Sequence, residues 1–159
     1  ARAIADVAPE AAPVAALPGR CLRLLVPLEG LEKFSAAADA ACAAWRMETL
    51  GVQTRLTRRE DETFLRWACR DYVEVALGLP DPADVGQSLR LRQLRQDLVD
   101  AAIGAGGAFQ ISSTPDATRA QTEACYPQLA RFLAEKRRFD REERLVNDWY
   151  RRQRALLAG

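Results

Sequence analysis

Histidine is absent from this chain of 159 residues, and its absence excludes several kinds of catalytic site. Ser-His-Asp hydrolysis, histidine-activated cysteine chemistry and histidine-containing zinc sites all need an imidazole whose pKa lies near neutral pH. A serine without such a base is not a nucleophile. The common hydrolase and protease sites are therefore excluded.

Cysteine is scarce as well, and its spacing carries no metal or redox motif. The four cysteines lie more than twenty residues apart, so no CxxC pair can hold a metal or act as a dithiol. We expect them to be buried, reduced side chains that fill small apolar spaces. They are Cys21, Cys42, Cys69 and Cys125.

Neither a charge excess nor a long apolar run is present. The 23 basic and 22 acidic side chains give a net charge of +1, which provides no general attraction for nucleic acid or for an anionic membrane. No segment reaches the roughly 18 apolar residues of a membrane helix, and residues 1–19 lack the pattern of a signal peptide. The sequence therefore predicts a cytoplasmic protein, and its arginine and alanine bias is typical of a GC-rich bacterial genome.

The order of expected elements indicates an α+β fold. Residues 1–19, rich in alanine and proline, are expected to form a linker or arm, and residues 20–159 a single domain. Periodicity then predicts strand, helix, strand, strand, helix and strand over residues 21–26, 31–50, 52–57, 72–77, 91–103 and 108–112. This is the β-α-β-β-α-β order of a ferredoxin-like antiparallel sheet. Right-handed crossovers would place both helices on one face and leave the other face for a ligand or partner.

Three further helices are expected after residue 117. Thr118 with Gln121 forms a capping-box pattern, and Pro127 fits the first position of the next helix. Asp140 with Glu143 repeats the pattern before a last helix that would carry Leu145, Trp149 and Leu156 on one face.

Two groups of residues invite a phosphate-binding interpretation. The glycines of residues 104–107 end a helix, whereas a phosphate loop opens one, so a helix stop is the better interpretation. Residues 131–159 hold nine basic and five acidic side chains, which could bind a phosphate through guanidinium groups or form a salt-bridged helix. The interleaved acids favour the second alternative.

The candidate substrate-binding residues lie on a strand and at a strand end. Arg70 and Tyr72 could polarise an anionic or phenolic substrate through a fixed cation and a hydroxyl donor. Gln110 and Ser112 belong to a polar strand end, where ligand contacts and turn chemistry are both common. A structural role remains the main alternative for all four residues.

The last 60 residues or so resemble a known family. The stretches that carry the resemblance are residues 101–112, the Ala-Thr-Arg…Ala-Cys-Tyr-Pro block of residues 117–127, Lys136-Arg137-Arg138-Phe139-Asp140 and Asn147-Asp148-Trp149-Tyr150-Arg151. They are similar to the C-terminal end of FAD-linked oxidases of the vanillyl-alcohol oxidase and p-cresol methylhydroxylase type. In that family an N-terminal domain binds FAD, and a C-terminal cap covers the flavin ring and forms the substrate pocket.

The resemblance implies that this chain is the cap region of a flavoprotein oxidoreductase, as a fragment or a separate subunit. FAD would be held mainly by a partner domain, and the cap would enclose a small organic substrate. Arg70, Tyr72, Gln110 and Ser112 would then line the pocket, and Trp149, Tyr150 and Arg151 would contact the FAD-binding domain. Residues 113–116 depart from the family's aromatic and histidine-containing run, so the substrate is not carried over.

A rival hypothesis belongs to another functional class. The chain could be a free-standing ferredoxin-like module for binding or dimerisation, without redox activity. A cap separated from its partner should expose an apolar patch, whereas an evolved module should be a stable monomer or a symmetric dimer, so a homo-oligomer is a possible state.

Overall fold

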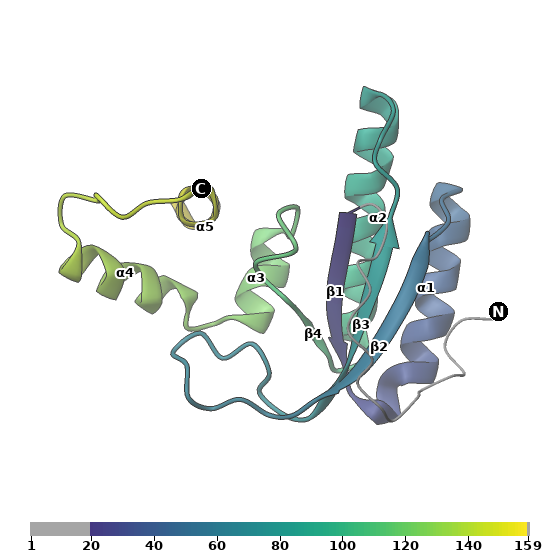
Figure 1. The fold of residues 1–159 in the computed structure, drawn as a ribbon, viewed down its shortest axis with the longest axis horizontal. Helices are drawn as coiled ribbons and strands as arrows, with labels where there is room; N and C mark the ends of the chain where they lie inside the picture. The colour runs from purple at the N-terminus through teal and green to yellow at the C-terminus, as the bar shows by residue number, and fades with distance from the viewer. Residues whose placement is uncertain (1–19, 159) are drawn as a thin grey trace.

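The computed structural model describes residues 20–158, and the predicted arm of residues 1–19 lies outside this range (Figure 1). In chain order the first elements are β1 (Arg20–Val26), η1 (Leu28–Gly30), α1 (Leu31–Trp45), β2 (Gly51–Thr57), β3 (Tyr72–Leu79), α2 (Val85–Gly104) and β4 (Ala108–Phe109). The four strands form one antiparallel sheet in the order β2-β3-β1-β4. The predicted α+β class with an antiparallel sheet is confirmed.

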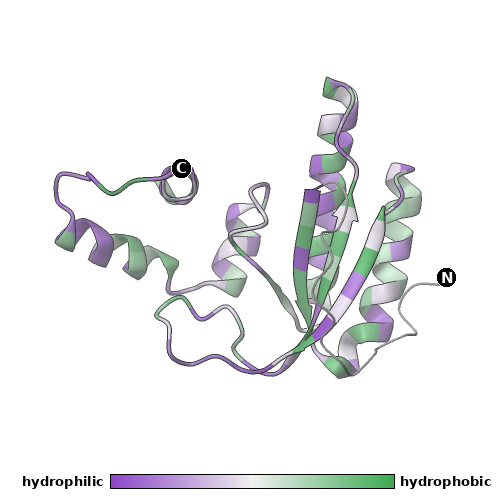
Figure 2. Cartoon of the chain, viewed as in Figure 1, coloured by the Kyte–Doolittle hydropathy of each residue, from purple (hydrophilic) through white to green (hydrophobic). Residues whose placement is uncertain are grey.

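Alternation along the strands sorts their side chains onto two faces of the sheet. On one face, alternate residues of β1 and β3 join Phe34 of α1 and the apolar side of α2 in the main core. Figure 2 shows these central strands as mostly apolar. The core members from β1 and β3 are Leu22, Leu24, Val26, Val73, Val75, Leu77 and Leu79.

The other face of the sheet is partly covered, which corrects the expectation of a free surface. The segment of residues 58–71 places Ala68 against Leu25, Tyr72 and Ala108, and these four side chains form a second small core. The same segment reaches the C-terminal helices, because the ring of Phe64 lies 6.2 Å from the ring of Phe132. Residues 58–71 therefore link the sheet to the C-terminal part of the chain.

Several predicted boundaries are wrong for local reasons. The first helix ends at Trp45, five residues before its expected end at residue 50, because Arg46 adopts a left-handed conformation with φ of 51°. The second helix begins earlier than predicted, at Val85, since the side chain of Asp84 accepts a hydrogen bond from the Gln87 amide. The last strand has only two residues, so Gln110 and Ser112 lie in the turn that follows it.

Three helices follow the sheet: α3 (Arg119–Cys125), α4 (Leu129–Phe139) and α5 (Asp148–Ala158). The capping box of Thr118 and Gln121 is confirmed at the start of α3. The other two predicted helix starts are wrong. Pro127 precedes the Gln128 cap of α4, and Asp140 follows α4 instead of opening α5.

The joint between α4 and α5 explains the second of these errors. The carboxylate of Asp140 accepts hydrogen bonds from the backbone amides of Arg144 and Leu145, which turns the chain without forming a helix. Leu145 therefore lies outside α5 and is 80% exposed. The side chain of Asn147 accepts a hydrogen bond from the Tyr150 amide at the true start of α5.

Within residues 20–158, no helix is long and apolar enough to span a membrane.

Gly107 joins α2 to β4 at a point of close backbone contact. A Cβ atom at this position would lie 2.1 Å from the carbonyl oxygen of Leu25 and 2.9 Å from that of Ala102. The Gly107 amide itself donates a hydrogen bond to the Ala102 carbonyl. Glycine is therefore required where the chain crosses from helix to sheet.

Replacing this glycine tests the close contact. We expect Gly107→Ala to lower the free energy of unfolding by about 2 kcal/mol or more, because β1 or α2 must shift to admit the methyl group. Gly104→Ala is the matched control, since a Cβ at Gly104 meets no atom within 4 Å. Urea unfolding of both variants measures the difference, and equal stability of the two would contradict the proposed close contact.

Candidate functional site

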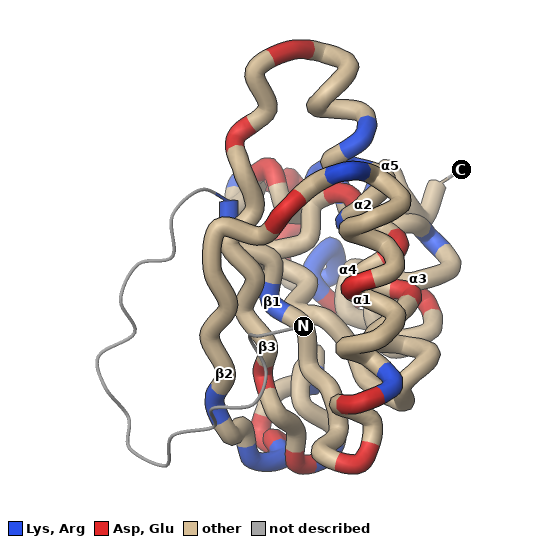
Figure 3. Tube along the Cα trace, turned by 90° about the vertical axis from the view of Figure 1, so that its right-hand side faces the viewer, with Lys and Arg blue, Asp and Glu red and all other residues tan. Residues whose placement is uncertain are grey.

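A buried carboxylate lies on the face of the sheet opposite α1 and α2. Glu74 of β3 is only 2% exposed, and its position in the register is opposite Leu25 of β1 and Arg55 of β2. Its oxygen Oε1 accepts a hydrogen bond of 2.6 Å from Arg23, and Oε2 accepts one of 2.8 Å from Arg55. We call Arg23, Glu74 and Arg55 the sheet triad. Figure 3 shows the charges on these neighbouring strands.

The two arginines of the sheet triad are partly open to solvent. The side chain of Arg23 is 29% exposed and that of Arg55 is 52% exposed, whereas the side chain of Glu74 is 3% exposed. The hydrogen bond to Glu74 raises the pKa of the Arg23 guanidinium. A guanidinium presents five N–H donors in a planar fork, so each arginine can bind Glu74 and still offer donors to a carboxylate, phenolate or phosphate.

Sequence reasoning missed the sheet triad, although a signal was present. Glu74 is the only charged residue in the strand Tyr72–Leu79, and Arg23 interrupts the apolar run of β1. A lone charge in an apolar strand must find a partner, because burying an unpaired charge is costly. The partner of Glu74 could not be named, since the register of three strands decides it.

Arg70 and Tyr72 lie close together, as their proposed shared role requires. The Arg70 guanidinium is 5.6 Å from the centre of the Tyr72 ring, and its Nη2 donates a hydrogen bond of 2.9 Å to the Gly106 carbonyl. Arg70 also forms an exposed ion pair with Glu29. Arg70 thus ties the segment of residues 58–71 to the turn between α2 and β4.

Tyr72 is buried and stays protonated at neutral pH. Burial, with the hydrogen bond between its hydroxyl and the Cys69 thiol, raises the pKa of Tyr72 to about 12. The hydroxyl and the Cys69 sulfur are 2.9 Å apart. At neutral pH Tyr72 can therefore act as a neutral hydrogen-bond donor and not as a base.

The turn that carries Gln110 and Ser112 is held by a buried tyrosine. The Tyr126 hydroxyl donates a hydrogen bond to the Phe109 carbonyl and accepts one of 3.3 Å from the Ile111 amide. The Tyr126 ring also packs edge-on against Phe109 at 5.6 Å. Tyr126 belongs to the Ala-Cys-Tyr-Pro block, so part of that block has a structural explanation. Tyr126 holds the turn after β4 in place.

Gln110 and Ser112 occupy different environments within this turn. The Gln110 amide pairs with the Arg23 carbonyl on β1, and its own carbonyl accepts bonds from Ser113 and Thr114. Gln110 thereby lies beside Arg23 of the sheet triad, whereas Ser112 is exposed. The structure therefore brings Gln110 close to the sheet triad and Arg70 close to Tyr72. It does not place Ser112 with either pair.

The four cysteines are free, as expected, but the expectation that all are buried is wrong. Cys69 is exposed and the other three are half-buried. Burial raises the pKa of Cys125 to about 11, so its thiol stays protonated. Among the described residues, no group of three or more acidic or cysteine side chains is placed to bind a metal ion.

The three predicted contact residues in α5 differ in their accessibility. Tyr150 is buried and donates a hydrogen bond of 2.7 Å to Glu143, and Trp149 packs its ring edge-on against Phe132. Only Arg151 is exposed, where it pairs with Asp148. The two aromatic side chains fasten α5 to α4, so a partner could reach Arg151 more directly than either ring.

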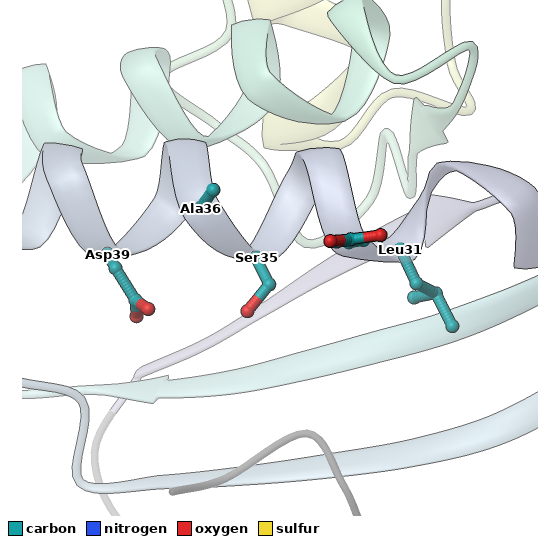
Figure 4. A pocket seen from close by; sticks show the side chains of 5 residues that line it. Leu31, Ser35, Ala36 and Asp39 are labelled. Carbon is teal, nitrogen blue, oxygen red and sulfur yellow. The ribbon is translucent and has the colours of Figure 1, made fainter. Parts of the chain in front are cut away.

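The glycines of residues 104–107 do not form a phosphate cradle. Their amides are used inside the protein, because Gly106 donates to the Ile103 carbonyl and Gly107 donates to the Ala102 carbonyl. These glycines therefore offer no N–H groups to the phosphates of FAD. A groove of about 420 Å³ lies instead along α1, where Leu31, Ser35 and Asp39 project from the helix (Figure 4). It contains none of the predicted site residues.

Comparisons with known proteins give no further assignment. No protein-family model matches the chain, and no curated protein matches it significantly. The interpretation of the site therefore depends on its geometry and on the sequence resemblance.

Removing the charge of Glu74 tests the sheet triad. We expect Glu74→Gln to lower the free energy of unfolding by about 1–3 kcal/mol, because two guanidinium groups lose their buried carboxylate. The partial exposure of both arginines keeps this value below that of a fully buried pair. Asp81→Asn is the control, since it breaks only the exposed pair of Asp81 with Arg20 and should change stability by less than about 0.5 kcal/mol.

The Asp140 joint predicts a loss of stability in acid. The hydrogen bond from Lys136, together with two backbone amides, lowers the pKa of Asp140 to about 2. Because the folded pKa lies below the unfolded value of about 3.9, its contribution is fully present above pH 4 and is lost as the pH falls toward 2. Thermal unfolding of wild type and Asp140→Asn should therefore differ at pH 5 and converge near pH 2. A constant difference over this range would contradict the assignment.

Proposed function

We propose that the chain is the substrate-binding cap region of an FAD-dependent oxidase or dehydrogenase, built on a ferredoxin-like sheet. The order of elements from β1 to β4 and the strand order β2-β3-β1-β4 support the ferredoxin-like assignment. Under this proposal FAD is held by a partner domain, and the cap encloses a small organic substrate beside the flavin.

The observation that carries the proposal is the exposure of two large apolar side chains within the last 60 residues or so, the part of the chain that resembles the family. Phe139 at the end of α4 is 83% exposed and Leu145 in the following joint is 80% exposed. The segment from α3 to α5 extends from the body of the molecule on the side of β4 (Figure 1). Exposed large hydrophobic side chains on a projecting segment are expected of a surface that meets another protein domain.

The polar side chains of the sheet face give the cap its chemical role. Arg23 and Arg55 can hold an anionic or phenolic oxygen, and the neutral hydroxyl of Tyr72 can donate a hydrogen bond. Gln110 lies beside Arg23 and adds a further polar group. The cap would exclude water and orient the substrate, while the hydride acceptor is the flavin of the partner domain.

Binding to an FAD-binding domain tests this proposal. The chain is mixed with FAD-loaded binding domain of the vanillyl-alcohol oxidase type, and association is measured by titration calorimetry. We expect micromolar affinity for wild type and at least a tenfold loss for Leu145→Glu, because a charge would be buried at the interface. Leu89→Glu is the matched control, since Leu89 is also exposed but lies on α2.

Flavin reduction provides the second readout. If a complex forms, anaerobic addition of phenolic or 2-hydroxy-acid substrates should bleach the flavin only when the cap is present. Arg55→Ala should weaken this response without weakening the association of the two domains. No complex at micromolar concentration, or equal loss in the Leu145 and Leu89 variants, would count decisively against the cap assignment.

A further inference from the structure

Two free cysteines from distant parts of the sequence border the same small core. Cys69 lies in the segment of residues 58–71 and is exposed, whereas Cys125 is the last residue of α3 and is half-buried. Cys125 packs against the second small core, whose members include Tyr72 and Ala68, the residue before Cys69. The Cys69 sulfur lies 2.9 Å from the Tyr72 hydroxyl. The fold therefore brings both thiols to one core.

The electrostatics of this region also indicate that the two thiols are neighbours. Burial raises the pKa of Cys125, and the charge of a Cys69 thiolate raises it further. Burial likewise raises the pKa of Tyr126, to which the charges of Cys125, Tyr72 and Cys69 all contribute. Interactions between charges weaken with distance, so groups that act on one another in this way lie close together.

We propose that Cys69 and Cys125 form a reversible redox pair, in which a peroxide oxidises Cys69 and Cys125 then closes a disulfide with it. The proposal goes beyond the cap function and does not depend on it. Redox-sensitive cysteines are typically accessible to the oxidant and placed beside a resolving thiol. Cys69 meets the first condition by its exposure, and the position of Cys125 at the same core meets the second.

The reaction balances with hydrogen peroxide as the only co-reactant. The Cys69 sulfur attacks one peroxide oxygen, the O–O bond breaks, and Cys69 becomes a sulfenic acid while water leaves. The Cys125 sulfur then attacks the Cys69 sulfur, the S–O bond breaks, and the departing hydroxide takes the Cys125 proton to leave as water. Overall both thiols are oxidised to the disulfide, and the peroxide is reduced to water.

The local structure permits the short approach that a disulfide needs. A disulfide joins residues whose Cα atoms are about 4.4–6.8 Å apart. Residues 61–71 form no helix or strand, so the backbone at Cys69 can adjust while Cys125 stays anchored at the end of α3. The other cysteines lie elsewhere, because Cys42 packs against the main core and Cys21 belongs to β1.

Closing the disulfide changes the surroundings of Tyr72. In the reduced protein the Tyr72 hydroxyl is engaged by the Cys69 thiol. A disulfide sulfur has no proton to donate and accepts hydrogen bonds only weakly, so oxidation releases the hydroxyl for another partner. The redox state of the pair thus decides whether Tyr72 is available to a ligand on the sheet face.

Counting thiols in the whole chain tests the pair. Reduced wild type is treated with hydrogen peroxide at neutral pH, denatured and alkylated, and its intact mass gives the number of modified thiols. All four cysteines should react before oxidation and two fewer after it, and peptide mapping should identify a link between Cys69 and Cys125. Cys42→Ser is the matched control and should respond like wild type, whereas Cys69→Ser should lose no thiol. A wild type that keeps all its thiols, or a link to Cys21 or between chains, overturns the proposal.

Trapping the intermediate tests the order of the two steps. Dimedone labels a sulfenic acid and leaves thiols and disulfides unmodified. During peroxide treatment Cys125→Ser should accumulate a dimedone adduct on Cys69, and wild type should show about tenfold less, because Cys125 consumes the sulfenic acid first. Equal labelling of the two proteins would contradict the role of Cys125 as the resolving thiol.

Unfolding in urea tests whether the link fits the native fold. The disulfide closes a long loop, so oxidation should raise the urea midpoint of wild type by about 1 M, and a thiol reductant should reverse the change. Cys69→Ser should show no such shift. A midpoint that stays the same or falls in the oxidised wild type would mean that the native structure does not hold the two cysteines as a pair.

Discussion

The antiparallel pairing of β1 with β3 is the constraint on which the rest of the structure depends. It runs over seven facing positions, and both β2 and β4 attach to it. Because successive side chains point to opposite faces, this one register assigns every residue of both strands either to the core under α1 and α2 or to the opposite face. If β1 slipped by one residue relative to β3, Arg23 would point into the core under the helices and Leu24 would point to the opposite face.

The opposite face shows how the fold accommodates a buried charge. The strand of Glu74, β3, contains no basic residue that could pair with the carboxylate. Two arginines from the neighbouring strands β1 and β2 provide the hydrogen-bond donors instead. Since both arginines remain partly exposed, the carboxylate is stabilised without enclosing the cations. The same face is closed farther along by residues 58–71, so polar and apolar surfaces meet next to Tyr72.

The C-terminal helices depend on buried tyrosine hydroxyls in the same manner. Tyr126 holds the turn after β4, and Tyr150 joins α5 to the left-handed residue Glu143, whose φ is 49°. Each ring packs among apolar side chains or beside the Lys136 ammonium, and each hydroxyl forms a hydrogen bond, to the Phe109 carbonyl for Tyr126 and to the Glu143 carboxylate for Tyr150. With the joint fixed internally, Phe139 and Leu145 remain on the outside, where the proposed FAD-binding partner would cover them.

The sequence by itself determined the α+β class, the four strands, the two long helices and the capping box at Thr118, because periodicity and capping involve residues close in the chain. The sequence also identified Arg70 and Tyr72 as candidate site residues, with Tyr72 at the start of β3 and Arg70 two residues before it. Only the tertiary structure decided that Glu74 lies between two arginines, that Cys69 is exposed, and that Asp140 makes a turn instead of opening a helix. Each of these outcomes depends on partners distant in sequence or on competing hydrogen bonds, and local patterns contain no information about which partner prevails.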